Sequence, residues 1–408
     1  MRVQYGWVVV AAGMLISCVS MGSCLSLGVF LQPMAEDTGW SRTGISSAGT
    51  LVFLAMGASA FGWGRLNDRW GTRPVVLSGM VLLGIGLIAA SRATSLAQFE
   101  VLFGLGVGVA GGSVYAPLMT VASAWFDRQR NLAVSLVSAG MGMSPLVVAP
   151  SVGGLISAYD WRTAMLTLGI VAIVLLIPAA LLIRKPPPAI PEPGMPDHPR
   201  RAASTAPPMT AAQAFRTYAF AALALTHFAC CAAHSGPIFH MVPNAMLCGI
   251  AQMMAVSVYS VAGLSGLGGR LLLGIASDRY GAKPVLVAGL AVQAIAAGTY
   301  YFVSELGEFY ALAVVFALAY GGVMPLYATL VREYFGIHIM GTVFGAVSAA
   351  ASFGMALGPP LAGGWVFDTF NGYGWLYIGS FGIGLGAMAV ALTFKPLPRP
   401  APLTVQPA

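Results

Sequence analysis

Arg270 stands in the middle of an otherwise uncharged apolar stretch, GLSGLGGRLLLGIAS, which begins at Gly263. Asp278, the nearest carboxylate along the chain, is eight residues away, and Gly266 occupies the position one helical turn before the arginine. A guanidinium binds a carboxylate through two parallel hydrogen bonds. An arginine without a fixed counter-charge therefore favours a site for an organic anion. The alternative is a packing arginine bonded to main-chain carbonyls.

Hydroxyl and thiol groups in other apolar stretches could complete a site for a small acid. Tyr115 lies in GGSVYAPLMT, Tyr320 and Tyr327 lie in ALAYGGVMPLY, and Ser23 and Cys24 are weaker candidates near the start of the chain. Each tyrosine stands close to a Gly-Gly pair and a proline, which could loosen a helix and turn main-chain groups toward a cavity. Tyrosine is also ordinary helix-packing material, so packing remains the alternative for each.

The segment HFACCAAH carries a different set of reactive side chains. His227, Cys230, Cys231 and His234 follow the spacing i, i+3, i+4, i+7 and so share one helical face. Two imidazoles and two thiols suit a soft metal ion, but one straight helix rarely surrounds a metal, and we expect no metal site. We favour a proton-linked role for His227 or His234, because imidazole titrates near neutral pH. His240, further along, is a third candidate.

The composition decides what kind of element carries these residues. Hydrophobic residues make up 58% of the 408 positions and charged residues 8%, whereas a soluble domain has about 25% charged residues. Helices that span a bilayer need about 20 apolar residues each. The first span lacks the cleavage site of a signal peptide. The sequence predicts an all-α membrane protein with twelve spans, at roughly 6–33, 43–66, 74–93, 97–125, 132–156, 163–183, 217–241, 250–277, 284–304, 309–331, 340–366 and 375–394.

The predicted spans place Arg270 deep in the membrane. Eight residues separate it from the loop that begins at Asp278, which corresponds to about 12 Å in a hydrocarbon core about 30 Å thick. An arginine near the midplane costs about 3 kcal/mol on insertion scales, so it should face a wet cavity or an anion. The remaining acidic residues offer no obvious partner inside the spans, because Glu100 and Glu333 lie near span ends.

The positive charges predict the orientation of the chain. With the N-terminus in the cytoplasm, the cytoplasmic loops hold all but four of the 20 Lys and Arg residues, namely Arg42, Arg92 and Arg162 on the outer face and Arg270 inside a span. This asymmetry favours cytoplasmic termini. It also accounts for the net charge of +7, so no nucleic-acid partner is expected. The five cysteines lie within or at the edges of the apolar spans, so we expect them to be packing residues that form no disulfides.

The chain repeats itself with an offset of 210 residues. GRLNDRWGTRP, which begins at Gly64, matches GIASDRYGAKP, which begins at Gly274, and PSVGG at Pro150 matches PLAGG at Pro360. A Pro-rich, basic segment lies between the halves and reads as a flexible linker. We expect two similarly oriented six-helix bundles at 1–183 and 213–395, a cytoplasmic linker at 184–212, a cytoplasmic tail at 396–408, and a transport path between the bundles.

The duplicated loop resembles the signature of the major facilitator superfamily. The resemblance implies a major facilitator fold and a conformational latch, in which a carboxylate at a helix end, beside basic groups and the N-terminus of a neighbouring helix, joins two helices in one state. Helix capping and topology signals are the plainer interpretation. The latch residues are Gly64, Asp68, Arg69, Gly71, Arg73, Gly274, Asp278, Arg279, Gly281 and Lys283.

A narrower resemblance concerns WFDRQRNLAVSLVSAGMGMSP, which begins at Trp125, and YGWVVV near the N-terminus. Both are similar to segments of the monocarboxylate transporter family and its bacterial relatives, including oxalate/formate antiporters. The resemblance implies that Arg270 binds the substrate carboxylate. Animal members have an aspartate where this chain has Gly266 and a lysine where it has Leu25. Those groups are associated with proton coupling, so coupling by that route is in doubt here.

These features predict a secondary active transporter in a bacterial cytoplasmic membrane. No phosphate-binding loop, catalytic constellation or pore filter is visible, so an ATP motor, an enzyme and a channel are disfavoured. We expect a monomer without a cofactor that moves a small monocarboxylate, such as lactate or pyruvate, with a proton as co-substrate. Organic anion exchange is the leading alternative, and a metal or drug carrier is a further one.

Overall fold

The computed structural model describes residues 2–126, 129–186, 209–357 and 365–395. The described chain is helical, with no strand in those ranges. Its twelve long apolar helices confirm the predicted number of membrane spans. These spans are Tyr5–Leu31, Ser47–Trp70, Thr72–Ala90, Leu96–Trp125, Arg130–Ala158, Trp161–Leu181, Tyr218–Leu247, Met254–Tyr280, Ala282–Thr299, Leu306–Phe335, Met340–Leu357 and Gly374–Leu392.

The burial pattern is that of a protein surrounded by lipid. Large apolar side chains such as Ile85, Val174 and Leu264 are exposed along the spans, whereas several serines are fully buried between them. A bilayer accepts exposed aliphatic side chains, and the helices meet one another through small and polar residues. The protein is therefore a multi-pass membrane protein.

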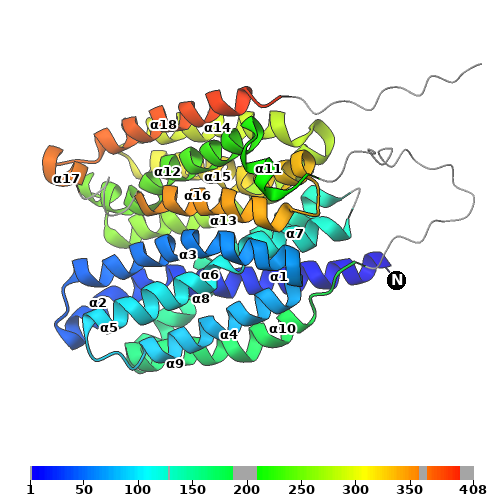
Figure 1. Cartoon of the computed structure of the whole chain (residues 1–408). Coiled ribbons are helices and arrows are strands. Elements are labelled where there is room, and N and C mark those ends of the chain that lie inside the picture. The colour runs from blue at the N-terminus through cyan, green and yellow to red at the C-terminus, as the bar shows by residue number, and fades with distance from the viewer. Residues whose placement is uncertain (1, 127–128, 187–208, 358–364, 396–408) are drawn as a thin grey trace, which may run out of the picture.

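The N-terminal half contains the first six spans, and Figure 1 shows it as one bundle below the other. Its elements are α1 Arg2–Leu25, α2 Leu27–Thr38, α3 Arg42–Trp70, α4 Thr72–Ala90, α5 Leu96–Phe99, the π-helical segment η1 Glu100–Val107, α6 Gly108–Gly112, α7 Tyr115–Trp125, α8 Arg130–Ala158, α9 Trp161–Val171, the π-helical segment η2 Ala172–Leu176 and α10 Ile177–Leu181.

The C-terminal half forms the second bundle, which lies above the first in Figure 1. Its elements are α11 Ala211–Phe215, α12 Tyr218–Leu247, α13 Gln252–Tyr280, α14 Ala282–Thr299, α15 Leu306–Phe335, α16 Met340–Leu357, α17 Trp365–Phe370 and α18 Gly374–Leu392. The two halves meet mainly where α3 packs against α16 and α8 against α13.

The 210-residue repeat extends to the helix boundaries. α4 begins at Thr72 and α14 at Ala282, and α8 begins at Arg130 and α16 at Met340. The predicted tail and most of the predicted linker lie outside the described residues, so the exact limits of the four predicted segments remain predictions.

Two predicted spans are interrupted. The first bends at Ser26, between α1 and α2, and the fourth breaks at Ser113 and Val114. At the second break the backbone N–H groups of Ser113 and Val114 donate to carbonyls three residues earlier, at 3.0 and 3.2 Å. Such bonds tighten the turn and redirect the helix. The expected loosening after Gly111 and Gly112 is therefore present in this span.

The corresponding loosening is absent from the tenth span, where α15 is continuous through its glycines and proline. A Cβ atom at Gly321 would lie 2.4 Å from the carbonyl oxygen of Gly266, and one at Gly322 would lie 2.7 Å from that of Gly269. These glycines allow α15 and α13 to approach closely, and tertiary packing keeps the helix regular. The sequence-based expectation was wrong here.

Candidate functional site

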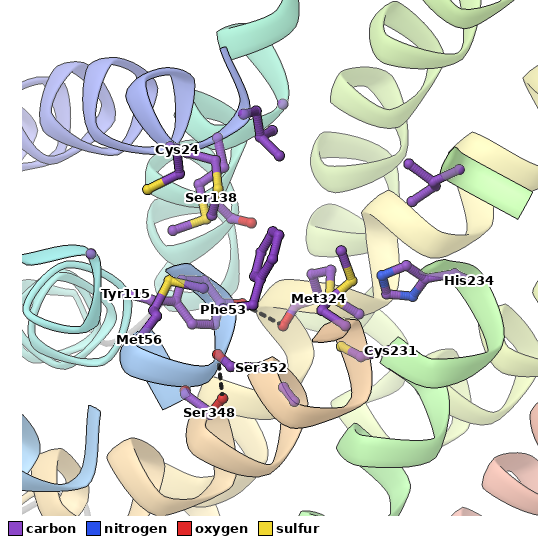
Figure 2. Close-up of a pocket in the computed structure, with 18 of the residues that line it drawn as sticks. Cys24, Phe53, Met56, Tyr115, Ser138, Cys231, His234, Met324, Ser348 and Ser352 are labelled. Atoms are coloured by element: carbon purple, nitrogen blue, oxygen red, sulfur yellow. Dashed lines mark hydrogen bonds between the residues drawn. The ribbon is translucent and has the colours of Figure 1, made fainter. Parts of the chain in front are cut away.

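A cavity of about 200 Å³ lies between the two halves, and its walls come from both of them. Figure 2 shows Tyr115 and Ser138 from the N-terminal half facing Met324 and His234 from the C-terminal half. Much of the remaining wall is apolar, with Met21, Phe53 and Met56 among its members. The described lining residues include no aspartate or glutamate.

Arg270 of α13 is in the wall of this cavity, with 6% of its surface exposed. Its Nε donates to Ser138 Oγ at 3.2 Å, and its Nη1 donates to the carbonyl oxygen of Gly266 at 3.0 Å. Both acceptors are neutral. A Cβ atom at Gly142 would lie 2.7 Å from Nη1, so a glycine in α8 gives the guanidinium its space.

Gly266 leaves a gap beside the guanidinium. A Cβ atom there would lie 3.4 Å from Arg270 Nη1 and 3.6 Å from the hydroxyl of Tyr320, which are ordinary contact distances. The cation and the phenol therefore flank one small space, and Tyr320 lines the same cavity. That space has room for about one methyl group, because the carbonyl oxygen of Ala317 would also lie 3.4 Å from the Cβ atom. A carboxylate in the adjoining cavity, which Arg270 and Tyr320 both line, could accept hydrogen bonds from both groups.

Tyr115 joins the two halves within the cavity. Its hydroxyl donates to the carbonyl oxygen of Met324, at 2.9 Å, and its ring lies 5.3 Å from that of Phe344. Figure 2 shows this hydrogen bond as the dashed line beside Met324. The tyrosine was expected to contact a ligand. In this conformation its hydroxyl is bonded to protein, and the contact ties α7 to α15.

The two repeated loops make equivalent contacts across the interface, at the end of the bundle that we call the latch end. Asp68 accepts hydrogen bonds from the backbone N–H groups of Gly341 and Thr342, at 2.8 and 2.6 Å. Asp278 accepts from those of Asn131 and Leu132, both at 3.3 Å. Each carboxylate thus caps the N-terminus of a helix in the other half, where the helix dipole favours negative charge.

The glycines of the latch residues permit these contacts. A Cβ atom at Gly64 would lie 2.1 Å from the carbonyl oxygen of Gly341, and one at Gly274 would lie 2.2 Å from Ser135 Oγ. Gly71 and Gly281 both have φ of 89°, a conformation in which glycine is strongly favoured.

The sequence and the fold of this chain both match those of known proteins. The model of the Major Facilitator Superfamily matches residues 11–359 and again 267–408. The chain belongs to the major facilitator superfamily. A xylose:proton symporter, XylE bound to 6-bromo-6-deoxy-D-glucose, superimposes with a TM-score of 0.75 at 15% identity, covering 97% of each chain. The transporter FucP in the outward conformation superimposes with a TM-score of 0.68 at 13% identity, covering 94% of this chain and 98% of FucP.

Within the superfamily, this facilitator is related to monocarboxylate transporters. It is 31% identical over 370 residues to monocarboxylate transporter 11 of Homo sapiens, covering 88% of this chain and 76% of that protein. It is also 24% identical to the oxalate:formate antiporter of Oxalobacter formigenes, covering 89% of this chain and 86% of the antiporter. The fold and the relatives are those of transporters.

The basic latch residues of this facilitator do not surround the carboxylates. Arg69 and Arg73 are exposed, the guanidinium of Arg279 lies over the Tyr280 ring at 5.4 Å, and Lys283 donates to the carbonyl oxygens at the end of α18. Among the described residues, the hydrogen bonds given to each aspartate come from a helix N-terminus.

The histidines of the seventh span occupy different surroundings. His234 lines the cavity, with Nδ1 4.0 Å from Cys230 Sγ and its ring 5.2 Å from that of Tyr320. His227 also borders the cavity, but its ring stacks on Tyr327 at 3.9 Å.

His240, in contrast, is outside the cavity wall, with its ring 5.0 Å from that of Tyr373. Of the three proton-linked candidates, His234 is thus the one whose ring lies next to another polar group of the cavity wall.

Two further candidates lie behind the cavity wall. Tyr327 is fully buried and its hydroxyl donates to the carbonyl oxygen of Thr226 at 3.4 Å, and Ser23 Oγ donates to the carbonyl oxygen of Val19 at 2.8 Å. Neither lines the cavity, whereas Cys24 does. The structure therefore gives Tyr327 and Ser23 packing roles in this conformation.

One thiol of the seventh span, that of Cys230, has a partner in α14. Cys230 Sγ lies 3.5 Å from Gln293 Oε1, and the amide of Gln293 donates to the carbonyl oxygen of Cys230. Among the described residues, no group of three or more His, Cys, Asp or Glu side chains could hold a metal ion.

Sequence reasoning missed Ser138 and Gly142, which contact the guanidinium from the other half. The signal was present in SAGMG, where a serine and a glycine four residues apart share one face of α8. It pointed to close helix packing, and nothing in the sequence identified Arg270 as the partner.

Proposed function

We propose that this facilitator is a secondary active transporter for a small monocarboxylate of the lactate or pyruvate class, with Arg270 binding the substrate carboxylate. The observation that carries the proposal is the buried guanidinium, which has only the neutral acceptors Ser138 and Gly266 in a cavity whose described wall holds no carboxylate. A buried cation without a protein counter-charge is costly. A bound anion would remove that cost.

The rest of the cavity supports a small, partly apolar acid. The hydroxyl of Tyr320 lies beside the guanidinium, where it can donate to a second carboxylate oxygen. Phe53, Met56 and Met21 line the same cavity. Their apolar side chains suit a short hydrocarbon chain and do not suit a sugar with many hydroxyl groups. The names of the relatives agree with an acid as cargo.

The arrangement of the halves supports alternating access. The cavity lies between two bundles that are joined at the latch end by Asp68 and Asp278. Release of these contacts would open the cavity toward the latch end, and the distribution of positive charge supports a cytoplasmic position for that end. The proposal includes cytoplasmic termini, a bacterial cytoplasmic membrane and a monomeric transporter.

An inward proton gradient is the proposed source of energy. Symport of a proton with the substrate would use it, with His234 as the coupling residue. Gly266 and Leu25 stand where animal monocarboxylate transporters carry an aspartate and a lysine, so another titratable group must act. His234 lines the cavity beside Tyr320. Arg270 lines the same cavity, so a bound anion would offset its positive charge and favour protonation of the imidazole.

Anion exchange is the second candidate, because one relative is an oxalate:formate antiporter. The two modes differ in one measurable requirement. Uptake by symport is stimulated by an inward proton gradient and needs no internal anion, whereas uptake by exchange needs an internal anion and is not stimulated by the proton gradient.

The test is uptake of labelled lactate into proteoliposomes, with and without an inward pH gradient. We expect stimulation by the gradient and at least a tenfold loss in Arg270→Lys, because an ammonium cannot bind a carboxylate through two parallel hydrogen bonds. Arg92→Lys, at an exposed position of the opposite end, is the matched control.

Full uptake by Arg270→Lys would refute the proposed site. Uptake that needs internal oxalate or formate, and that ignores the pH gradient, would replace symport by exchange. Equal yield and equal melting temperature of the purified variants separate loss of binding from loss of folding.

A further inference from the structure

A second pocket, of about 240 Å³, lies at the latch end of the N-terminal bundle, outside the central cavity. Arg73 at the start of α4 and Arg184 and Lys185 after α10 line it, together with Trp70 and Gly71. All three cations are exposed, and the described lining contains no acidic residue. The pocket therefore concentrates three positive charges, which we call the basic pocket.

The described residues at the equivalent place of the C-terminal bundle are arranged differently. The repeat places Lys283 at the position of Arg73, and Lys283 Nζ donates to the carbonyl oxygens of Leu392 and Phe394 at the end of α18. The ammonium group of Lys283 thus caps the C-terminal end of α18 and joins α14 to α18.

In the N-terminal bundle the corresponding carbonyls have other partners. The hydroxyl of Tyr5 donates to the carbonyl oxygen of Leu182 at 3.0 Å, and Trp125 Nε1 donates to that of Arg184 at 2.9 Å. The aromatic side chains thereby replace the lysine. Arg73 is left exposed, hydrogen-bonded to none of the described residues.

The basic pocket lies at the ends of membrane-spanning helices. The third span begins at Thr72 and the sixth ends at Leu181, so the pocket is level with the ends of two spans. Leu181 and Leu182 are 41% and 46% exposed and Trp70 is 59% exposed. Exposed leucines beside a tryptophan at a span end are typical of the boundary between acyl chains and headgroups.

We propose that the basic pocket binds the phosphate group of an anionic phospholipid. Arg73 can bind two phosphate oxygens through its guanidinium, and Lys185 adds a point charge. The Lys185 side chain lies against Gly71, because a Cβ atom there would lie 2.6 Å from Lys185 Cε. The acyl chains of the lipid would lie along the exposed leucines, which a soluble phosphate could not use.

The test is lipid binding to the purified full-length protein, measured by native mass spectrometry and by the melting temperature. The probes are phosphatidylglycerol, phosphatidylcholine and inorganic phosphate. Each basic residue near a membrane surface contributes about fivefold in affinity for anionic lipid. We expect Arg73→Gln/Lys185→Gln to bind phosphatidylglycerol about 30-fold more weakly than the unchanged protein.

The matched control is Arg92→Gln/Lys395→Gln, which removes the same charge at two exposed positions outside the basic pocket. Lys395 is the repeat equivalent of Lys185, and its substitution keeps the net charge of the two variants equal. We expect this control to bind phosphatidylglycerol within twofold of the unchanged protein.

Three results would overturn the proposal: an equal loss in the control variant, equally tight binding of phosphatidylcholine, or equal stabilisation by inorganic phosphate. The last result would assign the pocket to a soluble phosphate. None of the three depends on whether the central cavity carries monocarboxylates, so this test and the uptake test fail independently.

Discussion

Arg270 Nε and Ser138 Oγ are hydrogen-bonded at 3.2 Å, although one residue belongs to the C-terminal bundle and the other to the N-terminal bundle. The hydrogen bond joins Arg270, in the proposed anion site, to a helix of the other bundle. The two bundles must move relative to each other in alternating access. Ser138 therefore both orients the guanidinium and joins the two halves in this conformation.

Ser138→Ala should weaken substrate binding without abolishing it. The change removes one neutral acceptor from a buried cation, and hydrogen bonds to charged groups contribute about 1.5–3 kcal/mol. We expect the KM for uptake to rise roughly tenfold. Ser144→Ala is the control, because Ser144 Oγ donates only to Met141 within its own helix. Equal effects of the two changes would remove the orienting role.

Asp68→Asn should destabilise the closed latch more than Asp278→Asn. Asp68 makes the shorter bonds, at 2.8 and 2.6 Å against 3.3 Å for both bonds of Asp278, and it is less exposed. A carboxylate at a helix N-terminus contributes about 0.3–2 kcal/mol.

A thiol placed between α3 and α16 reports this opening. Ala60 is buried beside Gly345, so Ala60→Cys should react slowly with a thiol reagent and several times faster in the Asp68→Asn background than in the Asp278→Asn background. The background carries Cys248→Ser, which removes the exposed native thiol. Unchanged reactivity in Asp68→Asn would exclude a latch at this residue.

Gly266→Asp should make anion binding depend on an added proton. The new carboxylate would lie beside Arg270 Nη1 and occupy the space that flanks Tyr320, where it competes with the substrate anion. We expect uptake to fall at least tenfold at neutral pH and to recover as the external pH is lowered. Gly266→Ala, which meets its neighbours only at contact distance, should keep most of the uptake. Uptake by Gly266→Asp that equals the unchanged protein at neutral pH would contradict a substrate position beside Gly266.

His234→Gln should remove the stimulation of uptake by a pH gradient, because the cavity then lacks the imidazole proposed to carry the proton. His227→Phe should keep the stimulation, because phenylalanine preserves the stacking on Tyr327. The measurement is the ratio of uptake with and without an inward proton gradient. If His227→Phe abolishes the ratio and His234→Gln keeps it, the coupling residue has been assigned to the wrong histidine.

Much of the architecture was predictable because it depends on local composition. The length of apolar runs indicates where helices cross a membrane, and all twelve were found. The 210-residue repeat indicated two equivalent halves, and the structure extends it to the helix starts at Arg130 and Met340. The cost of burying a guanidinium predicted that Arg270 faces a cavity, and Arg270 lies in the wall of one.

Other features could not be predicted because they depend on which helix faces which. Tyr115 and Tyr327 look alike in sequence, yet one reaches across the cavity to Met324 and the other packs behind its wall. The partner of Asp68 is a helix N-terminus 273 residues away. Both Gly-Gly pairs bring their helix close to a neighbour, because a Cβ atom at Gly112 would lie 2.9 Å from the carbonyl oxygen of Met56 and one at Gly321 would lie 2.4 Å from that of Gly266. Only the span of Gly112 is interrupted, and the glycine pattern alone did not indicate this difference.

The sequence by itself determined that the protein lies in a membrane, how many spans it has and that one cation lies deep within a span, because each follows from the free energy of placing a residue in hydrocarbon. It also determined the duplication, because matching stretches recur 210 positions apart. The tertiary structure alone decided which neutral groups surround that cation, which carboxylates cap which helices, and why Arg73 is exposed while Lys283 is bonded. These outcomes depend on contacts between elements far apart in the chain, and short-range pattern carries no information about them.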